Sequence, residues 1–174
     1  MTAGHQPVDE PEPLARRDDG LVVSLDPGRV DRDRVHRWLS EESYWAAGRT
    51  REVFERSLAG SLVAGVYDGP GPDAAQLAFA RVVTDGATFA WICDVYVDEA
   101  ARGRGLGTWL MDELVQELLH RRGILRLLLA TRDAHALYAK SGFAPLEGGW
   151  RWMEIDHRPA RDAILSAGPP PGVA

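Results

Sequence analysis

The stretch DVYVDEAARGRGLGTWLMDEL (94–114) joins an apolar run of strand composition to a helical pattern through a loop rich in glycine and arginine. Leu106, Leu110 and Leu114 recur every four residues, which is typical of one face of an α-helix. The apolar run ILRLLLA (124–130) follows, and it has the composition of a strand that is covered on both faces. The stretch therefore predicts a right-handed unit of two parallel strands joined by a helix.

The chain before this unit predicts a strand, two helices and an antiparallel meander. Residues 21–25 are β-rich, helical spacing begins at Asp31, and Thr50 can cap a second helix. Strand-like runs with turn-rich sequences between them then follow at 61–69, 75–86 and 87–97. Because these runs are joined by short turns, we expect them to pair as neighbouring hairpins.

The chain after the unit predicts a further helix and two strands. Asp133 can cap a short helix that ends at Gly142, and FAPL (143–146) and WRWMEI (150–155) are the last strand candidates. We therefore predict an α/β (α+β) single domain, with a mixed central sheet of about six to seven strands flanked by about four helices. The predicted order is β-αα-β-β-β-α-β-α-β-β.

Length and composition fit one globular domain. The chain has 174 residues, of which 45% are apolar and 26% are charged. We expect the folded domain to cover residues 20–156. Residues 1–19 and 157–174 are rich in proline and polar residues, so we expect a disordered N-terminal tail and a flexible C-terminal tail.

Charge and hydropathy exclude several classes of partner. The net charge of −6 argues against binding along a phosphate backbone, so we expect no nucleic acid partner. No apolar run approaches the roughly 18 residues of a spanning helix, and the N-terminal residues lack the apolar centre of a signal peptide. We therefore expect a cytoplasmic protein with no membrane partner. Cys93 is the only cysteine, so we expect a small buried side chain, no intrachain disulfide and no metal site.

Three interpretations compete for the loop RGRGLG (102–107). It can be a turn that binds nothing, since glycine-rich turns connect strands to helices in many proteins. It can be a nucleotide loop, but the chain has Thr108 where the Rossmann pattern G-x-G-x-x-G requires its last glycine. The lysine ending of the P-loop motif is absent as well. It can also be a pyrophosphate cradle made of backbone N–H groups and the positive end of the following helix. Arg102 and Arg104 would add positive charge to such a cradle.

Two motifs of this chain resemble a known family. Residues 102–107 match the acyl-coenzyme A signature [Q/R]-x-x-G-x-[G/A] of the GCN5-related N-acetyltransferases (GNAT), and ALYAKSGF (136–143) is similar to the second signature of that superfamily. Both motifs lie on the strand and helix segments where the family has them. The predicted element order from about residue 20 to 156 also agrees with the family.

The resemblance implies that acetyl-coenzyme A is the acyl donor and binds where two neighbouring strands of the sheet splay apart. Main-chain groups of 95–97 would face the pantetheine arm and the thioester, while N–H groups of 103–108 would bind the pyrophosphate. Thr131 stands where many relatives have asparagine, and its hydroxyl has a shorter reach. The residues expected at the donor are Val95, Tyr96, Val97, Arg102, Gly103, Arg104, Gly105, Leu106, Gly107, Thr108 and Thr131.

The resemblance also implies a proton donor for the leaving thiolate. Tyr138 stands where the family often carries that donor, and a phenol with a pKa near ~10 is not far from a thiol at ~8.5. The alternative is that Tyr138, next to Leu137, is an amphipathic core residue. The amine acceptor itself has a pKa near ~10.4, so it must lose a proton before it attacks.

Asp94 is the second catalytic candidate. It lies in the apolar run WICDVYV, eight residues before Arg102, where some relatives carry an acidic residue. A buried carboxylate without a partner is costly, so Asp94 calls for an explanation. It can act as a base, bind a cationic acceptor, or pair with a structural arginine such as Arg81.

In the family, the acceptor pocket lies between the first two helices and the loop before the last strand. Here the resemblance assigns Tyr44, Trp45, Arg49 and Arg51 to that pocket, with Arg81 on the neighbouring strand and Trp150 or Trp152 opposite. Aromatic walls favour a cation or a flat acceptor, whereas arginines favour a carboxylate or a phosphate. The two features point to different acceptors.

The leading hypothesis is an N-acetyltransferase that moves an acetyl group from acetyl-coenzyme A to a primary amine, by direct attack in a ternary complex. The acceptor would be a small molecule or a peptide, and the protein a monomer or a homodimer. The alternative is a non-catalytic regulatory module that binds coenzyme A. Turnover with an amine would separate the two.

Overall fold

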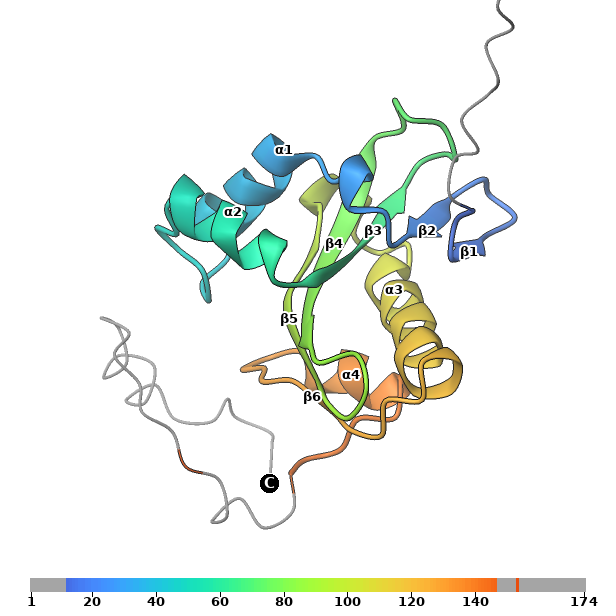
Figure 1. Ribbon diagram of the computed structural model, residues 1–174. Helices are drawn as coiled ribbons and strands as arrows, with labels where there is room; N and C mark the ends of the chain where they lie inside the picture. The colour runs from blue at the N-terminus through green and yellow to red at the C-terminus, as the bar shows by residue number, and fades with distance from the viewer. Residues whose placement is uncertain (1–11, 147–152, 154–174) are drawn as a thin grey trace, which may run out of the picture. The chain divides into compact units, whose positions relative to one another are not determined.

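The computed structural model describes residues 12–146 and Met153 (Figure 1). The chain forms two compact units, the first ending at Leu129 and the second beginning at Ala130. The first unit holds all the strands among the described residues.

These strands form one six-stranded sheet, whose spatial order follows the order along the chain. Neighbours from β1 to β5 are antiparallel, and β5 and β6 are parallel. The bounds are β1 (Ala15–Arg16), β2 (Val22–Ser24), β3 (Leu62–Tyr67), β4 (Gln76–Thr84), β5 (Ala90–Val97) and β6 (Leu127–Leu128).

Two helical segments separate β2 from β3. α1 (Arg32–Arg37) begins after Asp31, whose carboxylate accepts a hydrogen bond from the N–H of Arg34, and it continues as π-helical turns over Trp38–Glu42. α2 (Arg51–Ala59) begins after Thr50, whose hydroxyl accepts from Val53 N–H at 3.3 Å. Each N-cap satisfies an N–H that the first helical turn leaves without a partner.

α3 (Leu106–Val115) connects β5 to β6 and continues as π-helical turns over Gln116–Arg121. It packs on β3, β4 and β5 through its apolar face. The buried residues of that face include Leu106, Leu110 and Leu114, as the four-residue spacing predicts. The parallel pair β5 and β6, joined by α3, confirms the predicted strand–helix–strand unit.

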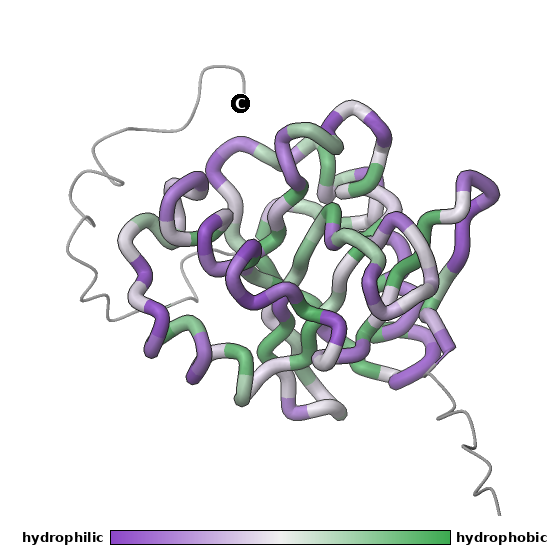
Figure 2. The backbone as a smooth tube through the Cα atoms, turned by 90° about the horizontal axis from the view of Figure 1, so that it is seen from above, coloured by the Kyte–Doolittle hydropathy of each residue, from purple (hydrophilic) through white to green (hydrophobic). Residues whose placement is uncertain are grey.

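The helices of the first unit cover both faces of its sheet. Figure 1 shows α1 and α2 on one side of the strands and α3 on the other. Trp38, Phe54, Phe79 and Tyr96 belong to one buried cluster between α1, α2 and the sheet. In Figure 2 the hydrophobic residues recur along the inner strands, and the hydrophilic residues dominate the outer turns. Burial of this apolar surface is the main driving force for the fold.

Three details differ from the sequence prediction. β1 lies within residues 1–19, where we expected a tail. The run ILRLLLA (124–130) forms only the short β6, and Leu125 is 88% exposed. Residues 143–146 form no strand, which is consistent with Pro145, because proline has no N–H to donate to a ladder. WRWMEI (150–155) lies outside the described residues apart from Met153, which is not in a strand.

The described part of the second unit contains α4 (His135–Lys140). Gly142 follows the end of the helix and has the positive φ of 89° that glycine adopts readily. The expected cap by Asp133 is wrong, because no side chain caps the helix. Instead, the hydroxyl of Thr131 accepts a hydrogen bond from Ala134 N–H at 3.0 Å and stabilises the turn before the helix.

Candidate active site

A β-bulge in β5 places Asp94 in the middle of the sheet. Phe79 of β4 faces Tyr96 of β5, and Arg81 faces Cys93, so two residues of β5 stand opposite one residue of β4. Asp94 is one of these two and has a φ of 53°, the only positive φ of a non-glycine residue among those the structure describes. Aspartate tolerates this left-handed conformation better than most residues.

Two arginines surround the carboxylate of Asp94. The terminal nitrogens of Arg49 donate to Asp94 Oδ2 at 2.6 Å and to Oδ1 at 3.1 Å, and Nε of Arg81 donates to Oδ2 at 2.7 Å. Arg81 also donates to the hydroxyl of Ser61 at 3.0 Å. The side chain of Asp94 is only 3% exposed, so both of its oxygens are paired inside the protein.

Electrostatics favour the charged form of Asp94. Burial by itself would raise the pKa of this carboxyl, but the hydrogen bonds and positive charges of Arg49 and Arg81 outweigh that effect, and the pKa lies below its ordinary value. A carboxylate with a lowered pKa is a weak base. Of the three roles considered for Asp94, this geometry favours pairing with structural arginines over proton abstraction.

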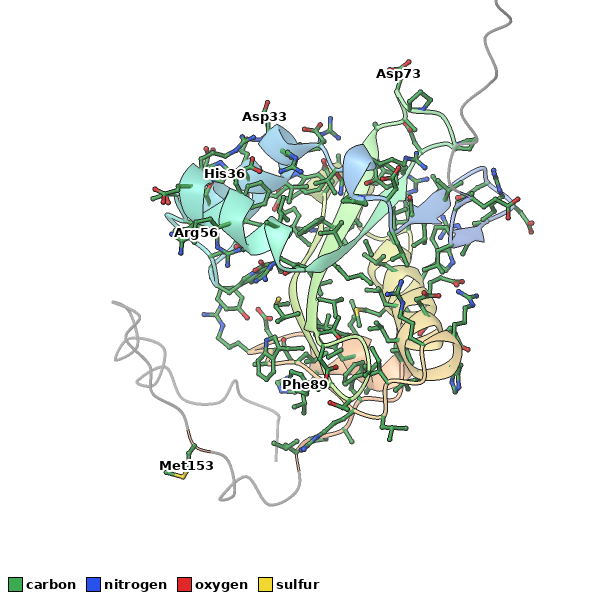
Figure 3. The ribbon with its side chains drawn as sticks, in the orientation of Figure 1. Asp33, His36, Arg56, Asp73, Phe89 and Met153 are labelled. Atoms are coloured by element: carbon green, nitrogen blue, oxygen red, sulfur yellow. The ribbon has the colours of Figure 1, made fainter. Side chains whose placement is uncertain are left out.

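The loop before α2 holds Arg49 in place. The N–H of Arg49 donates to Ala46 O at 3.0 Å, and the N–H of Gly48 donates to Ser40 O at 2.9 Å. Nε2 of His36, which Figure 3 labels on α1, lies 2.9 Å from the carbonyl oxygen of Arg49. A carbonyl can only accept, so this nitrogen donates. The guanidinium therefore extends from an anchored backbone.

The parallel strands β5 and β6 pair over a very short length. Ala90 and Trp91 of β5 face Leu127 and Leu128 of β6. Beyond Trp91, β5 continues to Val97 with no strand paired on its β6 side among the described residues. Among the described residues, the later part of β5 therefore forms no ladder on this side.

The loop between β5 and α3 exposes backbone N–H groups at the start of a helix. Gly103 and Gly105 have φ values of 79° and 72°, which glycine adopts without steric cost. Gly105 is the N-cap residue of α3, and no side chain caps this terminus. A Cβ atom built on either glycine would meet no atom within 4 Å, so the space beside the loop is open.

The two arginines of the loop, Arg102 and Arg104, make different contacts. Arg102 donates to Val97 O at 3.2 Å and to Glu99 Oε1 at 2.9 Å, so its guanidinium ties the loop to the end of β5. The side chain of Arg104 is 45% exposed, and its nearest carboxylate is that of Asp19 at 3.8 Å. Both side chains are about half exposed, and Arg104 is the better placed of the two to meet an anion because its guanidinium donates no hydrogen bond among the described residues.

The turn between β1 and β2 supports the loop, which the sequence did not predict. Arg17 donates to Arg104 O at 3.2 Å, lies 5.2 Å from the ring centre of Trp109, and donates to both carboxylate oxygens of Asp19. The hydrogen bond from Arg17 lowers the pKa of Asp19 to about 2. The sequence gives no signal for this contact, because residues 1–19 have the polar, proline-rich composition of a disordered tail.

The side chain of Tyr96 belongs to the core and does not project toward a donor. Its ring stacks on Trp38 at 5.3 Å, and its hydroxyl donates to Glu42 Oε2 at 2.5 Å. Burial and this hydrogen bond raise the pKa of Tyr96 above its ordinary value. The side chains of Val95 and Val97, its neighbours on β5, are partly exposed. The side chain of Tyr96 thus packs in the core, and its hydroxyl accepts a hydrogen bond from Arg102 at 3.3 Å.

The expected acceptor aromatics lie on the loop that follows α1. Tyr44 and Trp45 are 40% and 38% exposed, and their rings meet edge to face at 5.0 Å. Trp45 also lies 6.5 Å from the ring of Tyr96. Arg51 forms ion pairs with Asp33 of α1 and with Glu55, one turn further along α2. Trp150 and Trp152 lie outside the described residues.

The second unit carries the remaining expected site residues, Tyr138 and Thr131. Tyr138 lies on α4, and its ring meets Phe143 edge to face at 6.1 Å. Thr131 lies in the turn before α4, where its hydroxyl accepts the hydrogen bond from Ala134.

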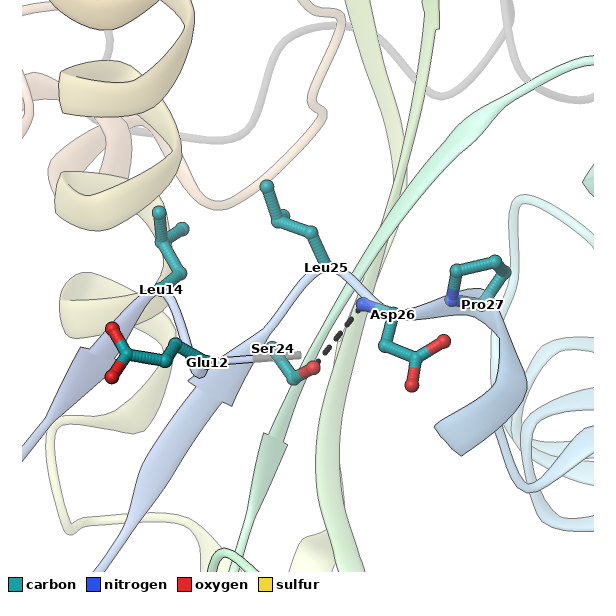
Figure 4. A pocket seen from close by; sticks show the side chains of 6 residues that line it. All are labelled: Glu12, Leu14, Ser24, Leu25, Asp26 and Pro27. Carbon is teal, nitrogen blue, oxygen red and sulfur yellow. Dashed lines mark hydrogen bonds between the residues drawn. The ribbon is translucent and has the colours of Figure 1, made fainter. Parts of the chain in front are cut away.

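A cleft of about 340 Å³ lies elsewhere on the first unit, and Figure 4 shows its wall. Its lining residues are Glu12, Leu14, Ser24, Leu25, Asp26 and Pro27. None of the expected site residues that the structure describes lines it. Its lining is mostly apolar, and the one hydrogen bond drawn there, from Asp26 N–H to Ser24 Oγ, is internal.

Three further findings concern other kinds of site. Cys93 is partly buried, and burial raises the pKa of its thiol to about 11, which disfavours the nucleophilic thiolate. No group of three or more potential ligands that could hold a metal ion occurs among residues 12–146 and 153. Within the same residues, none of the helices has the length and apolar character to cross a membrane.

Comparison with known proteins defines the class to which this fold belongs. The model of the acetyltransferase (GNAT) family matches residues 24–143, which is more than half of the chain. The protein belongs to this family. The sheet, the glycine loop and the helix order thus agree with the relationship that the two motifs suggested.

Individual relatives agree with this assignment. A crystal structure of a GNAT-family protein from Xanthomonas campestris pv. campestris, described as a candidate acetyltransferase, is 38% identical with a TM-score of 0.69, and the match covers 78% of this chain and 92% of that one. A Staphylococcus aureus protein, also described as a candidate acetyltransferase, is 25% identical with a TM-score of 0.57, covering 79% and 99%. A candidate acetyltransferase of Gibberella zeae is 28% identical over 149 residues, covering 77% of this chain and 83% of that protein.

Proposed function

We propose that the protein is an acetyl-coenzyme A-dependent N-acetyltransferase that acetylates a primary amine. The observation that carries this proposal is the position of the glycine loop. It connects the end of β5, which has no strand on its β6 side among the described residues, to the N-terminus of α3, where no described side chain makes a cap. Main-chain groups for a thioester arm and for a pyrophosphate would thus lie on consecutive segments.

The chemistry of the loop fits a coenzyme A pyrophosphate. Residues 106–108 form the first turn of α3, whose N–H groups have no acceptor within the helix. The positive end of the helix dipole favours an anion at the same place. The open space beside Gly103 and Gly105 allows phosphate oxygens to approach the backbone. Arg104 would add a positive charge, while Arg102 would keep the loop attached to β5.

The proposed reaction needs no covalent enzyme intermediate. The neutral amine attacks the thioester carbonyl, a C–N bond forms, and the C–S bond breaks with its electron pair leaving on sulfur. The amine nitrogen loses a proton to water or to a base. The departing thiolate takes a proton, so that the products are an N-acetyl amide and free coenzyme A.

Tyr138 is the proposed donor of the proton to the thiolate. A phenol can donate to a thiolate because their pKa values, near ~10 and ~8.5, are close. The family resemblance of residues 136–143 supports this assignment. We assign no proton transfer to Asp94, because both of its oxygens accept hydrogen bonds from arginines and its pKa is lowered. We assign it instead to the part of β5 that lies next to the proposed acceptor site.

The proposal is tested by thiol release from acetyl-coenzyme A in the presence of single amines. The panel includes polyamines, amino acids, aromatic amines, aminoglycosides and peptides, and mass spectrometry identifies the acetylated product. Thiol release that depends on one amine, with an N-acetyl product in equal amount, is the expected result. Saturable donor binding with no product across the panel would instead support a module that binds coenzyme A without catalysis.

A further inference from the structure

The buried group of Asp94, Arg49 and Arg81 carries a net charge of +1. Arg49 and Arg81 are two cations, and Asp94 is the only carboxylate that pairs with either of them in the described part of the chain. Their side chains are 18% and 14% exposed. Because a charge that is largely withdrawn from water is costly without a counter-charge, this site favours a further anion.

The two arginines are held differently, which separates their roles. Arg81 lies between Asp94 and Ser61 and donates to both, so it is fixed at two ends within the sheet. Arg49 comes from the loop before α2, and among the described residues its guanidinium donates hydrogen bonds only to Asp94. This bidentate contact orients the guanidinium plane. Arg49 thus combines a fixed orientation with the larger exposure of the two.

Arg49 lies close in the chain to two exposed aromatic residues, and its guanidinium contacts the strand whose backbone we assign to the thioester arm. Tyr44 and Trp45 precede it on the same loop and are both exposed. Asp94, which holds it, directly precedes residues 95–97, whose backbone we assign to the thioester arm. A ligand that contacts the aromatic pair and Arg49 together would therefore lie beside the place where the acetyl group is expected.

We propose, on the basis of the N-acetyltransferase function above, that Arg49 binds an anionic group of the acceptor, so that the acceptor is an amine that also carries a carboxylate or a phosphate. The guanidinium of Arg49 binds the anion, and Tyr44 and Trp45 pack on the apolar part of the molecule. A planar guanidinium suits both anions, since each presents oxygen atoms to its N–H groups. This assignment resolves the conflict between aromatic and arginine features in favour of an acceptor that uses both.

The test compares the binding of anionic and neutral aromatic compounds and does not depend on turnover. 3-Phenylpropionate and phenyl phosphate are the anionic probes, and 3-phenylpropanamide is the neutral one, with binding followed by tryptophan fluorescence or calorimetry. The wild-type protein should bind at least one anionic probe about tenfold or more tightly than the neutral probe, which corresponds to about 1.4 kcal/mol. The two anionic arms distinguish a carboxylate from a phosphate.

Variants separate an anion site from a structural ion pair. Arg49→Lys keeps the charge but loses the planar fork, and it should reduce the preference for the anionic probe with little change toward the neutral probe. Arg56→Lys is the matched control, since Arg56 is 75% exposed and points away from the sheet on α2 (Figure 3). It should leave all affinities unchanged. Circular dichroism shows whether each variant folds.

The outcomes are distinguishable from failure of the proposed function. Equal wild-type affinity for charged and neutral probes would overturn the anion site, even if acetyl-coenzyme A binds and amines are acetylated. An equal loss of affinity for all probes in Arg49→Lys would assign Arg49 a structural role and also overturn it. Absence of acetyl-coenzyme A binding would instead refute the N-acetyltransferase, whatever the probes show.

Discussion

Arg49 donates hydrogen bonds from both terminal nitrogens to the two carboxylate oxygens of Asp94, at 2.6 Å and 3.1 Å. The two residues are 45 positions apart in the chain. Their contact ties the loop before α2 to the bulge in β5, and Arg81 joins it from β4. One buried carboxylate therefore fixes three segments of the first unit at the point where β5 bends.

Replacement of Asp94 by asparagine should strongly destabilise the protein. The change leaves Arg49 and Arg81 without their counter-charge, and breaking a buried ion pair costs about 3–5 kcal/mol. For a chain of this size, that corresponds to a fall in melting temperature of roughly 10 °C. Asparagine also tolerates a positive φ, so backbone strain does not add to the effect. Thermal and urea unfolding of Asp94→Asn measure the change.

Glu52→Gln is the control for this experiment. Glu52 pairs with Arg56 on the surface of α2, where both side chains are at least 75% exposed. Exposed pairs of this kind contribute about 0.3–0.5 kcal/mol. If Asp94→Asn changed stability no more than Glu52→Gln does, the carboxylate of Asp94 would not be the centre of a buried ion pair.

The stability that Asp94 contributes should depend on pH in the acid range. The carboxyl has a lower pKa in the folded protein than in the unfolded chain, where it is about 3.9. Its contribution is therefore fully present above about pH 4 and is lost as the pH falls through the folded-state value. The free energy difference between wild type and Asp94→Asn should shrink below about pH 4. A difference that grew on acidification would contradict the lowered pKa.

Replacement of Gly105 by alanine should weaken donor binding. The positive φ of 72° costs an alanine about 1–2 kcal/mol, and the added Cβ stands in the open space beside the loop. We expect the dissociation constant for acetyl-coenzyme A to rise about tenfold or more. Gly86→Ala is the matched control, because Gly86 has a φ of 76° and equal open space but lies in the turn between β4 and β5. If both variants changed the affinity for acetyl-coenzyme A equally, the loop 102–107 would not be part of the donor site.

Replacement of Tyr138 by phenylalanine should slow turnover while donor affinity is retained. Loss of a general acid typically reduces the rate by about 10²–10⁴-fold. Phenylalanine keeps the ring that contacts Phe143, so α4 should stay folded. Tyr67→Phe is the control, since the buried hydroxyl of Tyr67 has no hydrogen-bond partner among the described residues. Steady-state kinetics on both variants, at saturating donor, provide the comparison. Unchanged turnover in Tyr138→Phe would remove this residue from the mechanism.

The elements with local signals were predictable from the sequence. The four-residue spacing of leucines predicted α3, and Asp31 and Thr50 marked the starts of α1 and α2. These signals depend on side chains within one or two turns of each other. The same holds for the glycine loop, because positive φ values and glycine residues coincide at 103 and 105.

The contacts between distant segments were not predictable in the same way. The bulge at Asp94 carries no glycine or proline that would mark it, and the pairing with Arg49 joins residues far apart in the chain. The run at 124–130 has the composition of a full strand, but composition does not determine how far β6 stays beside β5. The contact of Arg17 with the donor loop depends on tertiary packing, and the surrounding sequence resembles a tail.

The most direct test of the account is an equilibrium titration of the full chain with acetyl-coenzyme A at physiological salt, with binding measured by calorimetry. The account predicts saturable binding to one site per chain, with coenzyme A competing for the same site. A titration that showed no saturable binding of either acetyl-coenzyme A or coenzyme A would contradict the donor site, and with it the proposed N-acetyltransferase.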